Sequence, residues 1–218
     1  MKVVFTIFDI FWREYDEWFE KHRDLYLSEL RAIEYASRGV SKPWLEVGVG
    51  SARFAYSLGV EFGVDPSRSL LKLAFLRSVD VVEAVGEYIP FASNVFGGVF
   101  MIVTLCFLDN PVQVFREVYR VLKSDGRLVL GFIPLDSDWG RFYRDLKKKG
   151  HRFYQYASFY TVEQVVDLLE LTRFEPELYV STLIRSKPSE LEVFEEPYEG
   201  LRQNAGFVVV RARKRALR

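Results

Sequence analysis

The chain of 218 residues has little sulfur and little imidazole: one cysteine, Cys106, and two histidines, His22 and His151. A single cysteine excludes an internal disulfide and any metal cluster built from several thiolates. Two histidines so far apart in the sequence give no support for a zinc site. We therefore expect no bound metal and no chemistry that needs paired thiols.

The sequence also lacks a long apolar run and an excess of either charge. Its apolar stretch from Val3 to Trp12 is interrupted by Thr6 and Asp9 and has no small-residue cleavage site, so a signal peptide is not expected. No run reaches the length of a membrane span. Lysine plus arginine equals aspartate plus glutamate, at 30 each, which disfavours nucleic acid as a partner. We expect a cytoplasmic protein with no membrane partner. The basic segment from Arg211 to Arg218 is expected to be a solvated terminus, and nothing in the sequence fixes the oligomeric state.

Apolar residues make up 49% of the chain and aromatic residues 16%, enough for a sizeable core. The length favours a single domain spanning 1–218. Within it we distinguish an N-terminal helical cap (1–40), a core (44–134), an aromatic insert (135–160), and a C-terminal helix with a strand pair (161–213).

Short apolar segments alternate with amphipathic ones along most of the chain. This rhythm predicts an α/β protein with a mostly parallel sheet, helices on both faces, and an antiparallel pair closing one edge. Asp65-Pro66-Ser67 is expected to open a helix with the proline in its first turn, and Ser124-Asp125-Gly126 to end one. The seven expected strands are 44–47, 60–64, 79–85, 99–105, 127–134, 177–184 and 206–213.

The most informative segment is LEVGVGSARF, residues 45–54, between an expected strand and an expected helix. Its glycines allow positive φ and let a ligand approach the backbone. The next strand ends in Asp65, 17 residues after Gly48, near the spacing at which an acid binds a ribose diol. The simpler alternative is a tight turn followed by an aspartate that caps a helix.

Two residues of this segment disfavour a dinucleotide. A dinucleotide loop has a small residue where this chain has Arg53. The carboxylate of Glu46 would repel a pyrophosphate, but it would attract a ligand that carries an ammonium and a sulfonium group. A helix start at Ser51 would favour that ligand's carboxylate. S-adenosylmethionine has all these groups and a ribose.

Four landmarks in this order, LEVGVGSA, GVDPS, GEYIPF and FREVYRVLKSDGRLVLGF, give the chain a family likeness. It resembles the class I S-adenosylmethionine-dependent methyltransferases, of the small-molecule type related to the quinone-biosynthesis methyltransferases. The likeness covers roughly Trp44 to Ile133. It implies a doubly wound, Rossmann-like sheet of seven strands, the cofactor S-adenosyl-L-methionine, and methyl transfer to a small molecule.

The resemblance also implies roles for particular residues. The methionine part of the cofactor would contact Glu46, Gly48, Val49 and Gly50. Asp65 would bind the ribose hydroxyls, with Pro66 against the adenine face. The adenine edge would lie at Val85, Gly86 and Glu87, and a further contact would come from Thr104 at the end of the fourth strand.

Three positions depart from the family pattern. Val85 stands where the family usually has an aspartate for the adenine amino group. Phe96 is followed by Gly97 and Gly98 where the family commonly reads Phe-Asp, and Asp125-Gly126 stands where it has a glycine pair. The first removes one potential hydrogen bond to the adenine, worth roughly 0.5–1.5 kcal/mol. The other two concern the scaffold.

No fixed catalytic triad is expected, because methyl transfer is a displacement that needs orientation and the exclusion of water, and a base only when the acceptor must lose a proton. Tyr15 and His22, on the expected N-terminal helix, are the two candidates for catalysis. Tyr15 and Trp18 share a helical face and are candidates for cation–π contact with a sulfonium. Each of these residues has a packing or surface role as its alternative.

The insert follows the fifth expected strand and should lie at the carboxyl edge of the sheet, where open α/β folds bind ligands. Part of the acceptor pocket is therefore expected there, with packing of an extra helix as the alternative. Its candidate residues are Trp139, Phe142, Tyr143, Phe153 and Tyr154. Cys106, near the same edge, is expected to be a small buried hydrophobe.

Three functions compete. The first is S-adenosylmethionine-dependent methyl transfer to a small-molecule acceptor by direct displacement. The second is a non-catalytic S-adenosylmethionine-binding or regulatory module, and the third, disfavoured by Glu46 and Arg53, is a nicotinamide-dependent oxidoreductase.

Overall fold

The computed structural model describes residues 7–215, so positions 1–6 of the expected N-terminal helix lie outside the described residues. From residue 7 the expected helical cap consists of three helices, α1 (Ile7–Ile10), α2 (Trp12–Lys21) and α3 (Arg23–Ser37). The chain bends at Phe11 and at His22, neither of which has helical backbone angles. Among the described residues, no helix has the length and apolar character needed to cross a membrane.

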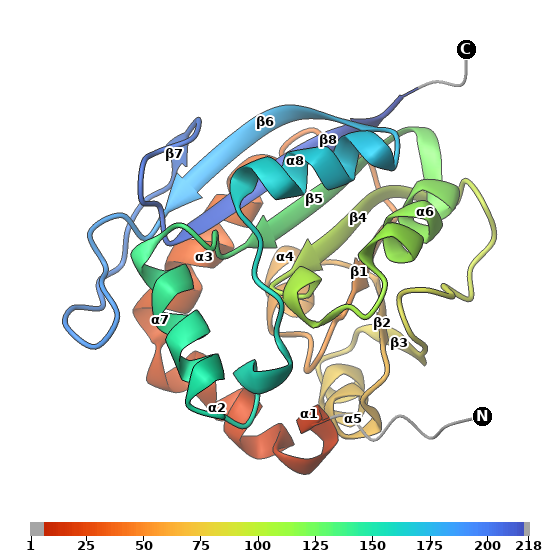
Figure 1. Ribbon diagram of the computed structural model, residues 1–218. Coiled ribbons are helices and arrows are strands. Elements are labelled where there is room, and N and C mark those ends of the chain that lie inside the picture. Colours follow the sequence, from red (N-terminus) through yellow and green to blue (C-terminus); the bar gives the residue numbers. More distant parts are fainter. Residues whose placement is uncertain (1–6, 216–218) are drawn as a thin grey trace.

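The strands form one sheet in the order β3-β2-β1-β4-β5-β8-β6-β7 (Figure 1). The five strands from β3 to β5 are parallel, and β8 runs antiparallel to both β5 and β6. The predicted α/β fold is thereby confirmed, including the antiparallel pair at one edge. The described chain has eight strands, one more than expected, because the two-residue β7 adds to β6. Their bounds are β1 Trp44–Val47, β2 Phe62–Asp65, β3 Asp80–Glu83, β4 Phe96–Ile102, β5 Leu122–Phe132, β6 Phe174–Thr182, β7 Tyr198–Glu199 and β8 Phe207–Lys214.

Helices cover both faces of the sheet (Figure 1). One face carries α3, α4 (Arg53–Leu58) and α5 (Arg68–Leu76), and the other carries α6 (Pro111–Val121) and α8 (Val162–Leu171). The remaining elements lie at the carboxyl ends of β4 and β5, where α1 and α2 also lie (Figure 1). They are α7 (Asp138–Lys148) and the 3-10 turns η1 (Leu105–Phe107) and η2 (Tyr154–Tyr156).

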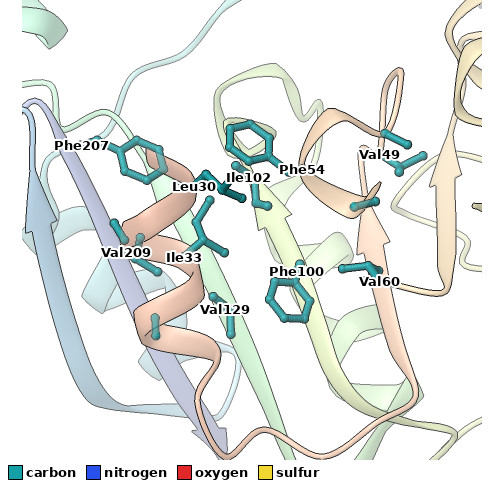
Figure 2. Packing of buried hydrophobic residues seen from close by; sticks show 14 of the residues in the cluster. Leu30, Ile33, Val49, Phe54, Val60, Phe100, Ile102, Val129, Phe207 and Val209 are labelled. Atoms are coloured by element: carbon teal, nitrogen blue, oxygen red, sulfur yellow. The ribbon is translucent and has the colours of Figure 1, made fainter. Parts of the chain in front are cut away.

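The central strands are apolar on both sides because both sides are covered. Along β4, Phe100 and Ile102 pack with Ile33 of α3 and Phe54 of α4, on the face seen in Figure 2. The intervening residues of β4 point to the opposite face, where they meet α6 and α8. Burying one such side chain stabilises the fold by about 1.5–3 kcal/mol. The apolar contacts on the two faces of β4 therefore hold the centre of the sheet in place.

Two expected element ends were wrong. Pro66 is not in the first turn of a helix: α5 begins at Arg68, and its N-cap is Ser67, whose hydroxyl accepts a hydrogen bond from the N–H of Leu70. Gly126 does not cap α6, which ends at Val121 and passes directly into β5. The chain continues as a strand at Leu122, with no separate turn, because Leu122 pairs with Phe96 ahead of a bulge in the β4–β5 ladder.

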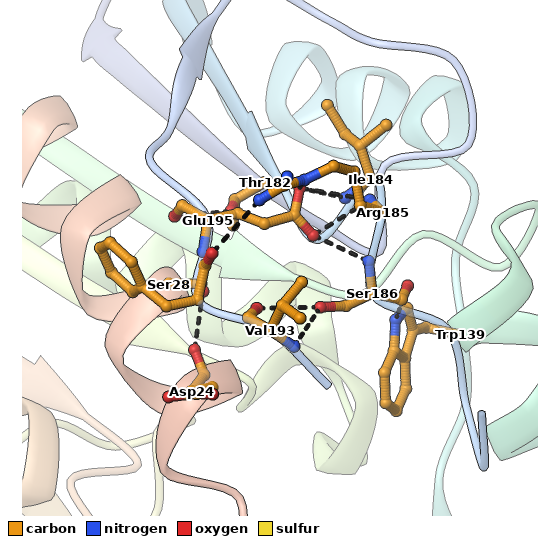
Figure 3. A network of polar contacts seen from close by, with 10 residues as sticks. Asp24, Ser28, Trp139, Thr182, Ile184, Arg185, Ser186, Val193 and Glu195 are labelled. Carbon is orange, nitrogen blue, oxygen red and sulfur yellow. Dashed lines mark hydrogen bonds and ion pairs between the residues drawn. The ribbon is translucent and has the colours of Figure 1, made fainter. Parts of the chain in front are cut away.

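A buried carboxylate organises the loop between β6 and β7. Glu195, 3% exposed, accepts hydrogen bonds from the N–H groups of Ile184, Arg185 and Ser186, and its own N–H donates to the hydroxyl of Ser28 on α3 (Figure 3). This network ties the loop to α3.

The solvated terminus was expected to begin at Arg211, which is too early in the chain. Residues 211–214 belong to β8, where Arg211 forms an ion pair with Glu177 and Arg213 forms one with Glu175. Their guanidinium groups are therefore engaged in pairing the two closing strands. The last part of that expectation, residues 216–218, lies outside the described residues.

Candidate functional site

The loop after β1 turns sharply beneath two side chains. Gly48 and Gly50 have φ of +77° and +52°. A Cβ atom on Gly48 would collide with the side chain of Thr104, and one on Gly50 would lie 2.8 Å from the hydroxyl oxygen of Tyr15. Both glycines are thus required by close approach as well as by φ. The structure brings Gly48, Gly50, Thr104 and Tyr15 together.

Asp65 at the end of β2 closes the other side of this loop. Its carboxylate accepts hydrogen bonds from the N–H of Gly50 at 2.9 Å and from the N–H of Ser67 at 2.8 Å. Burial raises the pKa of Asp65 to about 6 in spite of these two bonds. Each carboxylate oxygen keeps a free lone pair for a further donor. Asp65 orders the loop and remains able to accept hydroxyl groups.

Glu46 is the second buried acid of the loop. It is 2% exposed, and its Oε2 atom has no hydrogen-bond partner among the described residues. Burial, reinforced by the nearby charge of Asp65, raises the pKa of Glu46 well above its usual range. An unpaired buried carboxyl costs free energy, and a cation would remove that cost. A bound cation would therefore favour the charged form of Glu46.

Tyr15 covers the loop from α2. Burial, together with the charges of Asp65 and Glu46, raises the pKa of its phenol. Its ring packs edge-on against Phe8 at 5.4 Å and Phe19 at 5.6 Å between ring centres. Tyr15 therefore lies over the glycine loop, where an aromatic cluster holds it, and its catalytic role stays a prediction.

Ion pairs fasten α1 and α2 over the site. Asp16 accepts hydrogen bonds from Arg53 at 2.7 Å and from Arg77 at 3.0 Å, and Glu20 also pairs with Arg53. Burial of Asp16 is outweighed by the hydrogen bonds from these arginines, which lower its pKa to about 2. Asp9 accepts from the N–H of Ser69 at the start of α5. Arg53, the residue that disfavours a dinucleotide in the sequence, therefore attaches α2 to α4 through Asp16 and Glu20.

The expected adenine edge lies after β3. That strand ends at Glu83, short of the expected Val85, and the N–H of Ala84 donates to the carbonyl of Asp65. Gly86 packs against Val114 of α6, and the carboxylate of Glu87 accepts from the N–H of Asn110. These residues lie at the same edge as Asp65 and Pro66, and their contact with a cofactor stays a prediction.

A cavity of about 20 Å³, room for a single water, lies at the carboxyl ends of β4 and β5. Val103, one of its lining residues, has φ of +52°, which is rare for a β-branched side chain and marks a strained turn beside Thr104. Cys106 lines the same cavity, and burial raises the pKa of its thiol to about 12, consistent with an unreactive hydrophobe. Other lining residues are Phe132, Ile133, Tyr154, Phe159 and Tyr160.

The insert contributes to this cavity, but through different residues than expected. Of the five candidates, Tyr154 lines it. Trp139 is buried, and its indole N–H donates to the carbonyl of Ser186, which is a structural role. Tyr143 is buried against Tyr154, with ring centres 4.4 Å apart. The aromatic composition pointed to the insert, while only the path of the chain after η2 shows that Phe159 and Tyr160 face the cavity.

His22, the second catalytic candidate, lies in the bend between α2 and α3. Its Nδ1 is 2.8 Å from a carboxylate oxygen of Glu192, and its ring packs on Trp18 at 5.0 Å between ring centres. These contacts tie the helical cap to the loop before β7. They give His22 a structural partner and no contact with the glycine loop, so its catalytic role stays a prediction.

The sequence analysis did not single out a third buried acid, Glu29 on α3. It is 3% exposed, and burial raises its pKa to about 8. A charged residue flanked by Ser28 and Leu30 on the apolar side of a helix was the available signal. Its importance depends on what packs over α3, which no local pattern reveals.

Comparisons with known proteins agree with this geometry. The family model "Methyltransferase domain" matches residues 45–130. An uncharacterized protein of Methanocaldococcus jannaschii is 34% identical over 212 residues, covering 96% of this chain and 99% of that protein. A crystal structure from Thermotoga maritima, described as a SAM-dependent methyltransferase and possible histamine N-methyltransferase, is 37% identical, with a TM-score of 0.89 and coverage of 96% and 98%. A ubiquinone/menaquinone biosynthesis C-methyltransferase of Klebsiella pneumoniae is 26% identical over 138 residues, covering 63% of this chain and 49% of that protein.

The chain belongs to the class I S-adenosylmethionine-dependent methyltransferases. It is a methyltransferase, and its cofactor is S-adenosylmethionine. The residues fit this cofactor: the unpartnered oxygen of Glu46 suits the ammonium group, and Gly48 and Gly50 themselves add no side chain to the turn beneath Thr104 and Tyr15. The recognised resemblance is thereby confirmed.

Proposed function

We propose that this enzyme transfers the methyl group to a small-molecule acceptor by direct displacement, with the cofactor bound against the glycine loop and Asp65. The observation that carries this assignment is the pair of buried acids, Glu46 and Asp65, with one carboxylate oxygen of Glu46 unpartnered. A site with this charge favours a cationic ligand over a pyrophosphate, which disfavours the nicotinamide alternative.

The residues act by binding and orienting. The cofactor supplies a methyl group made electrophilic by its sulfonium. Glu46 pairs with the ammonium, Asp65 accepts the ribose hydroxyls, and Tyr15 covers the loop and keeps water out. Thr104 and Val103 face the boundary between the cofactor loop and the cavity, which is where we expect the acceptor. The Thermotoga maritima relative's description makes nitrogen one candidate acceptor atom.

Asp65→Asn provides the test of the cofactor assignment. The variant keeps the side-chain shape and loses the charge, so S-adenosylhomocysteine should bind at least tenfold more weakly by calorimetry, because charge-assisted hydrogen bonds are worth about 1.5–3 kcal/mol. Glu163→Gln, an exposed acid on α8, is the matched control and should bind as the wild type does. If the wild type, Asp65→Asn and Glu163→Gln bound S-adenosylhomocysteine equally well, Asp65 would have only a structural role.

Turnover is tested separately. Incubating the wild-type protein with methyl-labelled S-adenosylmethionine and a small-molecule extract should give a labelled product. Binding of the cofactor with no transfer to any extract component would instead support the regulatory-module alternative.

A further inference from the structure

A second cavity lies beside the helical cap. It has a volume of about 310 Å³ and is formed by α2, α3, α4 and the residue that ends α5. This volume is at the lower end of the range for small-molecule sites, about 300–1,000 Å³. Its described lining residues include none of those assigned to the cofactor, so the cavity is a separate candidate site.

Three arginines from three different elements line this cavity: Arg23 of α3, Arg53 of α4 and Arg77 at the end of α5. Arg53 and Arg77 both contact the Oδ2 atom of Asp16, at 2.7 Å and 3.0 Å. Arg53 also pairs with Glu20, which lines the cavity too. Arg23 is exposed, and across residues 7–215 no carboxylate forms an ion pair with it. Three guanidinium groups therefore face two carboxylates, and that of Arg23 is available for a further anion.

Aromatic side chains form much of the remaining wall. The hydroxyl of Tyr26 donates to the carbonyl of Arg53 at 2.9 Å, and its ring packs edge-on against Phe19 at 5.3 Å between ring centres. Tyr56, by contrast, is 65% exposed, so most of its ring is available to a ligand. Rings beside an unpaired guanidinium suit an organic anion with a planar ring, which gains aromatic contacts and charge-assisted hydrogen bonds together.

The same arginines connect the cavity to the glycine loop. Arg77 donates to the carbonyl of Ser51, within the loop segment 45–54, at 2.7 Å. Asp16, which the arginines hold, directly follows Tyr15, the residue that lies over the loop. An anion in the cavity competes with Asp16 for these guanidinium groups, and this competition weakens the attachment of α2.

We propose that this cavity is a regulatory site for a small organic anion, a carboxylate or phosphate monoester with a planar ring, bound by Arg23 and the exposed ring of Tyr56. The bound anion competes with Asp16 for Arg53 and Arg77, loosens α2, and so speeds the exchange of the cofactor. The inference goes beyond methyl transfer, because it adds a ligand that controls the enzyme without taking part in the reaction.

Binding is tested by calorimetry on the whole protein with 2-naphthoate and 2-naphthyl phosphate, and with 2-naphthylmethanol as their neutral counterpart. At least one anion should bind, at least tenfold more tightly than the alcohol. Arg23→Gln should weaken that anion at least tenfold and leave the affinity for S-adenosylhomocysteine unchanged, since Arg23 does not hold α2. Arg116→Gln, an exposed arginine on α6 with no ion pair across residues 7–215, is the matched control and should bind as the wild type does. Tyr56→Ser should weaken the anion several-fold, because the ring is lost.

The regulatory role is tested by the release of radiolabelled S-adenosylhomocysteine, followed by rapid filtration. A saturating amount of the anion should raise the dissociation rate several-fold in the wild type, and the same concentration should leave it unchanged in Arg23→Gln. Three outcomes would overturn the inference: neither anion binds more tightly than the alcohol, Arg23→Gln binds the anion as tightly as the wild type, or the bound anion leaves the dissociation rate unchanged. The calorimetric titrations need no cofactor, so their result is independent of the cofactor assignment.

Discussion

At the scale of single residues, departures from the family pattern have packing reasons in this chain. Gly97, where the resemblance leads us to expect an aspartate, lies so close to the loop before β1 that an added Cβ would collide with the carbonyl oxygen of Ser41. Gly98 is similarly pressed against Val40 and Trp44. The two glycines therefore match this chain's own approach to β1.

Gly97→Ala should destabilise the protein by about 3 kcal/mol, the upper end of ordinary overpacking, because the obstacle is backbone. Chemical denaturation would measure the loss as a lower midpoint with an unchanged slope. Gly150→Ala is the control: no atom lies within 4 Å of the added Cβ, so only its φ of +72° contributes and the loss should be about 1–2 kcal/mol. Equal losses would show that the Ser41 contact relaxes freely.

At the scale of elements, α2 is the part of the structure that covers the glycine loop. Tyr15 lies over Gly50, and the pairs from Asp16 to Arg53 and Arg77 hold α2 against α4 and α5. A ligand that reaches the glycine loop must therefore pass this helix. The strength of its attachment sets how fast ligand enters and leaves.

Asp16→Asn should speed both association and dissociation of S-adenosylhomocysteine, by an expected several-fold, since it weakens two ion pairs on α2. It should also lower stability by roughly 2 kcal/mol at neutral pH, in line with the lowered pKa of Asp16. Stopped-flow fluorescence would follow the rates. Glu17→Gln, which removes an exposed pair within α2, serves as the control and should change neither rate. Unchanged kinetics in Asp16→Asn would mean that α2 does not limit entry.

The local sequence predicted which helices and strands form better than it predicted the residues at which they begin and end. The periodicity of apolar residues predicted β1, α6 and the closing strand pair, because those patterns depend on burial alone. It missed the direct passage from α6 into β5, since strand pairing across Leu122 overrides the turn chemistry of Ser124-Asp125-Gly126. For the site, glycines and acids next to strands revealed the cofactor loop. Phe159 lines the cavity at the carboxyl ends of β4 and β5 through contacts between distant segments, which no local pattern encodes.

At the scale of the whole molecule, three buried acids make stability depend on pH. Burial raises the pKa of Asp65 to about 6, that of Glu29 to about 8 and that of Glu46 well above its usual range. The native state therefore binds more protons than the unfolded state between about pH 4 and pH 8. Stability must fall as pH rises through this window. Asp16 acts oppositely, and its contribution is lost only as pH falls from about 4 towards 2.

The unliganded protein should accordingly have a lower melting temperature at pH 8 than at pH 5.5. Asp65 alone accounts for roughly 1 kcal/mol of the change, because its pKa of about 6 leaves only the upper part of its shift within this pH range. Glu46→Gln should reduce the difference by raising the melting temperature at pH 8, and Glu163→Gln should not. Calorimetric scans at the two pH values would measure it. A melting temperature that rises steadily from pH 5.5 to 8 would contradict the assigned burial of these acids.

The unpaired carboxyl of Glu46 has a consequence for the protein inside a cell. Folding leaves the carboxyl of Glu46 without a partner at the glycine loop. A bound cation supplies that partner, so the liganded form opens less often than the empty one. Proteases degrade the opened chain. The lifetime of this enzyme should thus lengthen when S-adenosylmethionine is abundant and shorten when it is depleted, which makes its abundance follow the methyl supply.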